Sequence, residues 1–256
     1  MSPTATRLAS TVITVLLCLI VARVPLANAQ QLGQGPPIPI AVDLNKVPVG
    51  SWAEYTVTFG ETAPMTSRMA LVGKNATGNT IETSVEGGMM AMVGGKMLMS
   101  LKLPPGENGG RVSKMIMQMG ASDPMEMPLP EGSERQFTRP DPKNLVGRET
   151  IKVRAGSFKT KHYREQSGEG DTYDFWVSDR VLPLGLVKLS GEQKQNPAMK
   201  GGFRFELSAT GKDARPQVTK PPKPFDQAAL MKQISGGMSG GGPAPGAPGG
   251  APPTTK

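Results

Sequence analysis

Apolar and polar side chains alternate in a series of short segments along this chain, and this alternation is the feature that most constrains its fold. In residues 52–59, Ala53, Tyr55 and Val57 share one face, and the residues between them are polar. A period of two residues is typical of β-strands with one buried face. The pattern recurs in residues 68–72, 80–85, 97–103, 115–119, 150–154, 158–164, 172–178, 186–189 and 203–207. The sequence therefore predicts an all-β, mainly antiparallel domain over residues 50–215, built as a curved sheet or a half-open β-barrel.

Glycine and proline make long helices unfavourable in this chain. It contains 32 glycines and 25 prolines among 256 residues, about a fifth of the total. Both residue types destabilise helix interiors, so coiled coils and long helical bundles are excluded. Residues 73–78 are mostly turn formers, and they predict a hairpin between the strands that flank them.

The N-terminus has the pattern of a signal peptide. Arg7 precedes an apolar stretch over residues 8–21, and Ala27-Asn28-Ala29 places small residues where a signal peptidase cleaves. We expect residues 1–29 to be removed after Ala29 and the protein to reach the periplasm or the extracellular space, with no transmembrane segment left. Cys18 is the single cysteine and lies within the apolar stretch, so the mature chain has no disulfide.

Segments of different composition flank the predicted domain. Residues 30–49 are proline-rich and predict an extended lead-in, while residues 216–234 predict a proline-containing linker and a short helix capped by Asp226. Residues 235–256 consist largely of glycine and proline and predict a disordered tail. The formal net charge is +8, but the basic residues are not clustered among aromatic ones, so a nucleic acid partner is not expected.

Two groups of residues are candidates for reactive sites. His162, the single histidine, could act as a general base with Ser157, but a strand surface residue is the more ordinary interpretation. Glu169, Asp171 and Asp174 could supply oxygen ligands to calcium, but their spacing lacks the register of an EF-hand. We therefore expect no catalytic residue, no metal site, no cofactor and no enzymatic activity.

Methionines are concentrated in residues 89–127, which contain ten of the chain's 16. Met115, Met117 and Met119 fall on one face of a predicted strand, as Met97 and Met99 do on another. Three interpretations remain open: methionine as ordinary core, as a deformable lining for an apolar ligand, or as a set of thioether ligands for Cu(I).

A resemblance to a known superfamily covers about residues 147–189. Residues 149–160, with Ala155-Gly156 followed by Phe158 and Thr160, and the later stretch that joins Trp176 to Leu182-Pro183-Leu184-Gly185, carry it. They resemble the half-barrel superfamily of periplasmic lipoprotein carriers and related outer-membrane proteins. The resemblance implies a curved antiparallel sheet whose apolar concave face can hold acyl chains.

The sequence thus predicts an exported, non-enzymatic binding protein that holds a lipid or acyl chain on the concave face of a β half-barrel. The alternatives are a methionine-rich copper-binding protein, and an envelope structural or assembly protein without a small ligand but with a protein partner. The residues expected to line the apolar ligand are Met97, Met99, Met115, Met117, Met119 and Trp176.

Overall fold

The computed structural model describes residues 38–93, 95–105, 112–129, 137–166, 171–192 and 202–228. Three short 3-10 helices lie within this part of the chain: η2 (Leu44–Lys46), η3 (Gly88–Val93) and η5 (Pro142–Asn144). Its strands are β1 (Ile38–Pro39), β2 (Trp52–Phe59), β3 (Met65–Asn75), β4 (Gly78–Gly87), β5 (Lys96–Leu103), β6 (Lys114–Met119), β7 (Met125–Met127), β8 (Phe137–Thr138), β9 (Leu145–Val153), β10 (Gly156–Gln166), β11 (Thr172–Val177), β12 (Leu186–Glu192), β13 (Phe203–Gly211) and β14 (Lys223–Pro224).

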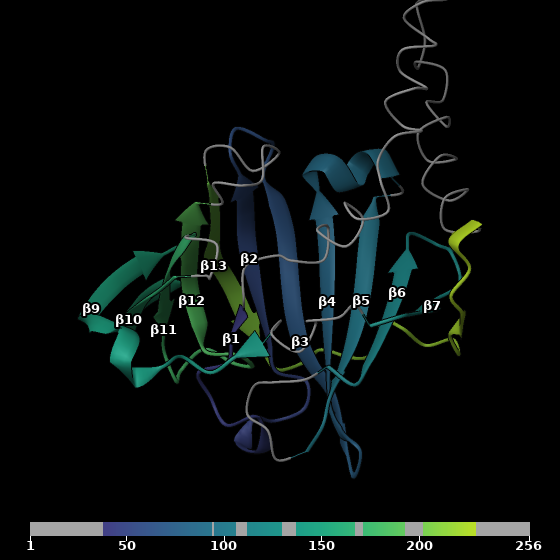
Figure 1. The fold of residues 1–256 in the computed structure, drawn as a ribbon, viewed down its shortest axis with the longest axis horizontal. Coiled ribbons are helices and arrows are strands. Elements are labelled where there is room, and N and C mark those ends of the chain that lie inside the picture. Colours follow the sequence, from purple (N-terminus) through teal and green to yellow (C-terminus); the bar gives the residue numbers. More distant parts are fainter. Residues whose placement is uncertain are drawn as a thin grey trace, which may run out of the picture.

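Twelve of these strands form one sheet in the order β14-β7-β6-β5-β4-β3-β2-β13-β12-β11-β10-β9. The pairings are antiparallel except that of β14 with β7, which is parallel. Figure 1 shows a strongly curved sheet with β9 at one end and β7, the neighbour of the terminal strand β14, far from it at the other. The predicted all-β fold is confirmed, in the form of an open curved sheet rather than a closed barrel.

The alternating segments form strands because one face of each can be buried. In β2, Ala53, Tyr55 and Val57 are at most 2% exposed, while Glu54 and Thr56 between them are partly exposed. Residues paired directly across neighbouring strands point to the same side of the sheet, so the buried side continues from strand to strand. Tyr55 on β2 and Leu207 on β13 are one such pair. We call this side the core face and the opposite side the outer face.

The hairpin predicted around residues 73–78 is formed by β3 and β4. The carboxamide oxygen of Asn75 accepts a hydrogen bond from the backbone N–H of Thr77, which closes the turn. Gly78 has a φ of 127°, and a Cβ there would lie 1.9 Å from the carbonyl oxygen of Leu103. Only glycine is compatible with that approach.

The segment expected to be an extended lead-in is partly core. β1 pairs with β8 in a separate two-stranded parallel sheet, and Ile40, Leu44 and Phe137 are at most 2% exposed against the core face. The folded domain therefore begins by residue 38, before the boundary expected at residue 50. The prolines of residues 36–48 obscured a short run of apolar residues that the curved sheet needs to fill its interior.

The chain after β13 returns across the outer face as a strap, residues 212–224. The carboxylate of Glu82 on β4 accepts hydrogen bonds from the backbone N–H groups of Gln217 (2.7 Å) and Val218 (3.3 Å). The strap ends at β14, next to β7 (Figure 1). Asp226 accepts a hydrogen bond from the N–H of Ala228, the contact expected of a cap. The predicted signal peptide and the glycine- and proline-rich tail lie outside the described residues.

Candidate functional site

The predicted methionines meet on neighbouring strands at one end of the core face. Met97 pairs with Met119, Met99 with Met117, and Met115 with Leu101 across β5 and β6. The row continues onto β7, where Met125 lies opposite Met117 and Met127 opposite Met115. We call these seven residues the methionine face: Met97, Met99, Met115, Met117, Met119, Met125 and Met127.

The methionine face is only partly covered by the described chain. Met99 and Met115 pack against the hydrophobic core, and Met125 is 5% exposed. The other residues of the face are partly exposed, as are Met99 and Met115 themselves. Paired side chains on adjacent strands lie about 4.5–5.5 Å apart at Cβ, so the thioethers form a continuous surface. The side chains of Met89 and Met92 lie outside the described structure.

Trp176 lies apart from the methionine face. Tyr173, Phe175 and Val177 on β11 point into the core, so Trp176, which alternates with them, points to the outer face. β11 is also separated from β5 by β4, β3, β2, β13 and β12. The structure therefore does not bring Trp176 together with the methionines predicted to share a lining with it.

Trp176 instead packs against His162 on the outer face. The two rings are stacked with centroids 4.3 Å apart and an interplanar angle of 13°. His162 Nε2 lies 2.6 Å from Asp174 Oδ1, and its Nδ1 lies 3.5 Å from Glu149 Oε1. The indole N–H of Trp176 donates to the same Glu149 oxygen at 2.6 Å, and Arg164 donates to both oxygens of Asp174. These contacts orient the imidazole, which is 13% exposed.

The other reactive constellations are not assembled in the described structure. Ser157 and His162 are five residues apart on β10 and therefore point to opposite faces. Asp171 is buried and accepts a hydrogen bond from the hydroxyl of Tyr173, whereas Asp174 lies on the outer face with His162. Glu169 lies outside the described residues. Within the part of the chain that is described, no three His, Cys, Asp or Glu side chains are grouped as metal ligands.

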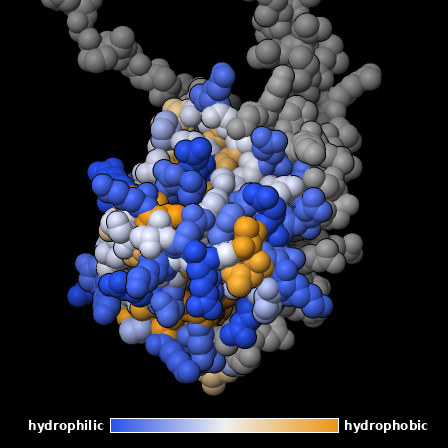
Figure 2. All heavy atoms as spheres, turned by 90° about the vertical axis from the view of Figure 1, so that its left-hand side faces the viewer, coloured by the Kyte–Doolittle hydropathy of each residue, from blue (hydrophilic) through white to orange (hydrophobic). Residues whose placement is uncertain are grey.

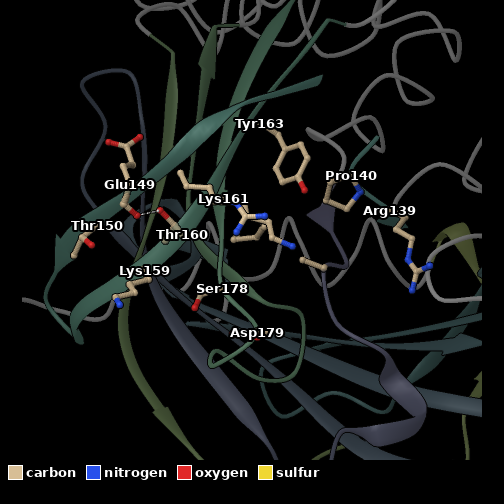
Figure 3. A pocket seen from close by; sticks show the side chains of 13 residues that line it. Arg139, Pro140, Glu149, Thr150, Lys159, Thr160, Lys161, Tyr163, Ser178 and Asp179 are labelled. Carbon is tan, nitrogen blue, oxygen red and sulfur yellow. Dashed lines mark hydrogen bonds between the residues drawn. The ribbon is translucent and has the colours of Figure 1, made fainter. Parts of the chain in front are cut away.

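The structure shows a cavity that the sequence analysis did not anticipate. It has a volume of about 690 Å³ and lies at the β9 end of the sheet. Figure 3 shows Arg139 and Pro140 on one side and Lys159, Thr160 and Lys161 of β10 on the other, with Tyr163 between them. The available sequence signal was the alternation of Lys159 and Lys161 in one strand, with Arg148 in the strand before it. The full lining is Ala41, Arg139, Pro140, Arg148, Glu149, Thr150, Lys159, Thr160, Lys161, Tyr163, Val177, Ser178 and Asp179.

Comparisons with known proteins show a distant likeness of fold. No protein-family model and no curated protein matches the chain. A Bacteroides fragilis protein with a YmcC-like fold is 12% identical, with a TM-score of 0.32, over 65% of this chain and 98% of its own. A hypothetical protein of Chlamydia trachomatis is 11% identical, with a TM-score of 0.41, over 70% of this chain and 94% of its own. At these values the likeness supports no assignment of family or function.

None of the helices in the described residues is both long and apolar enough to span a membrane.

Proposed function

We propose that this chain is an exported, non-enzymatic binding protein that holds an apolar ligand, a lipid or acyl chain, against the methionine face. The observation that carries the proposal is the partly exposed apolar surface formed by methionines on three adjacent strands. Methionine side chains are flexible and polarisable, so they adapt to ligands of irregular shape. Exposed apolar surface of this kind is stabilised when a ligand covers it.

The position of the ligand differs from the one that a simple half-barrel would offer. Ile40, Leu44 and Phe137 are buried in the hydrophobic core, so part of the interior is already filled by the chain itself. The methionine face lies toward the β7 end of the sheet, where every residue of β6 is partly exposed. We therefore place the apolar ligand over β5, β6 and β7.

Copper binding is the second candidate, and one arrangement favours it. Met99, Met117 and Met125 are direct neighbours across β5, β6 and β7, so three thioethers lie in one row. Soft thioether ligands suit Cu(I). Binding of an apolar ligand depends on the shape and apolar character of this surface, whereas binding of copper depends on its sulfur atoms. Replacing methionine by leucine should therefore preserve the first and abolish the second.

Native mass spectrometry of the mature protein purified from its own host tests the proposal. We expect co-purifying lipid, retained by Met115→Leu/Met117→Leu/Met119→Leu because leucine preserves the apolar surface and nearly the same volume. Met117→Glu should abolish retention, since it places a charge on that surface. Gln118→Glu is the matched control on the outer face of the same strand.

Each outcome of this experiment has a defined meaning. Copper bound by the native protein and lost in the triple leucine variant would replace the lipid proposal with the thioether site. A native protein that carries neither lipid nor copper, and that binds neither when they are added, would overturn both and leave a structural or assembly role. Equal loss of lipid in Met117→Glu and Gln118→Glu would also contradict the proposed surface.

A further inference from the structure

The cavity at the β9 end of the sheet is lined by positive charge on the core face. Lys161 lies directly opposite Arg148 on β9 and Val177 on β11, and Val177 belongs to the buried core. Arg148 and Lys161 therefore project to the same face as Val177, next to each other, where the rest of the sheet carries apolar side chains. Both side chains are exposed, so solvent screens them in part, but like charges placed directly opposite each other still disfavour a strand pair.

The described chain does not neutralise these charges. Arg139, Arg148, Lys159 and Lys161 form no ion pair or side-chain hydrogen bond with another described residue. Of the two acidic residues in the lining, Glu149 binds the indole N–H of Trp176 on the outer face. Figure 3 shows its carboxylate turned away from Lys161 and Tyr163. Among the described residues of the lining, Asp179 is the one acidic side chain left to offset the four cations.

A buried hydroxyl in the same cavity also lacks a partner. Ser178 is 5% exposed, and its Oγ forms no hydrogen bond with any described residue. It lies in the lining together with the buried side chain of Tyr163 (Figure 3). A buried hydroxyl without a partner is unfavourable, and such groups are uncommon in native proteins. A change of χ1 rotamer that turns this hydroxyl toward the cavity would bring it to an acceptor atom of a bound ligand.

We propose that this cavity is a binding site for a phosphate-bearing anion. A phosphate monoester carries a charge of about −1.5 to −2 at neutral pH and several acceptor oxygens, which suits four cations and a hydroxyl better than a single carboxylate does. The volume of about 690 Å³ falls within the range of small-molecule sites. The proposal goes beyond the apolar site and does not depend on it, because β9 and the methionine face are at opposite ends of the sheet.

Protection of an edge strand explains only part of this arrangement. β9 ends the sheet, and basic side chains on such a strand discourage pairing with other chains. That role would account for Arg148 and Lys152. It does not account for the unpartnered hydroxyl of Ser178 after β11, or for Arg139 after β8. The surface around β9 is mostly hydrophilic (Figure 2), which favours an anionic group over an apolar one at this end.

The test uses the full mature chain and two phosphate probes. Inorganic pyrophosphate is titrated by calorimetry, and vesicles of phosphatidic acid, a lipid phosphate monoester, in phosphatidylcholine are used in co-sedimentation. Arg148→Gln/Lys161→Gln should weaken binding by about tenfold or more, since each charge-assisted contact contributes strongly. Lys152→Gln/Arg154→Gln removes the same charge from the same hairpin outside the cavity and should change affinity by less than about threefold.

Ser178→Ala separates binding from folding. It removes an unpartnered buried hydroxyl, so the melting temperature should stay the same or rise while affinity falls several-fold. Binding of pyrophosphate supports a site for the phosphate group itself, and binding of the anionic vesicles alone supports a lipid headgroup as its source. The proposal is overturned if neither probe binds, if Ser178→Ala binds as well as the native protein, or if the two double variants weaken binding equally.

Discussion

At the scale of single residues, the stacked pair of His162 and Trp176 permits a test of both stability and activity. Replacing His162 by alanine removes a ring contact at 4.3 Å and leaves Asp174 with one fewer partner. We expect the free energy of unfolding to fall by about 1 kcal/mol, the usual contribution of an aromatic contact. Urea denaturation followed by tryptophan fluorescence measures it.

The same variant tests the expectation that the protein is not an enzyme. The native protein and His162→Ala should both fail to turn over generic ester, glycoside and phosphate substrates, because Ser157 lies on the opposite face of β10 from His162. Turnover by the native protein that disappears in His162→Ala would show that the expectation is wrong. Ser157→Ala is the control, because it tests whether any turnover lost in His162→Ala also depends on Ser157.

At the scale of elements, the strap over the outer face depends on Glu82. Burial raises the pKa of this carboxyl, and the two backbone N–H groups of the strap act in the opposite direction. Glu82→Ala leaves the N–H groups of Gln217 and Val218 without their acceptor, so we expect a loss of about 1–3 kcal/mol in unfolding free energy. Faster hydrogen exchange at these two amides should accompany it.

Glu86→Ala is the matched control on the same strand. Glu86 forms an ion pair with Lys96 at 2.8 Å, but its side chain is 50% exposed. Exposed pairs of this kind contribute little to stability, so unfolding and the exchange of Gln217 and Val218 should be nearly unchanged. Equal effects of the two substitutions would contradict the role given to Glu82.

The attachment of the C-terminal end of the strap, where Lys220 and Lys223 contact Asp123, is expected to weaken at low pH. Hydrogen bonds from Lys223 and Lys220 lower the pKa of Asp123 from 3.8 to about 2. Because the pKa is lower in the folded state, the stabilisation is present above about pH 4 and is lost as the pH falls toward 2. The protection factor of the Lys223 amide, which donates to Pro124, should fall over this interval. In Asp123→Asn, the protection factor of the Lys223 amide should already be low at pH 5 and should change little as the pH falls further.

At the scale of the whole molecule, processing at Ala29 should leave the fold intact. Among the described residues the buried core begins at Ile40, so cleavage after Ala29 removes none of the described contacts. Mass spectrometry of the mature protein should give a chain that starts at Gln30, and the protein should unfold in one cooperative transition. An N-terminus at Met1 in an envelope fraction would contradict export with cleavage.

Local alternation was enough to predict most strands, because it depends only on neighbours in the chain. Residues 52–59 were expected as a strand and form β2, and the hairpin of β3 and β4 was found from its turn residues. The grouping of Met115, Met117 and Met119 on one face followed in the same way. Because successive side chains of a strand point to opposite faces, the sequence alone shows which residues share a face of their own strand. These predictions needed no other information.

The register between strands was decided only by the tertiary structure. The opposition of Arg148 to Lys161, and of Met117 to both Met99 and Met125, depends on pairings that alternation within one strand does not specify. Trp176 and His162 became neighbours through the pairing of β10 with β11. Ile40 lies in the core because it fills the interior of the curved sheet. Glu82 is buried because residues of the strap, such as Gln217, cover its side chain. All these features depend on contacts between segments that are distant in the sequence, and the opposition of Arg148 to Lys161 is the one that places two cations side by side in the cavity.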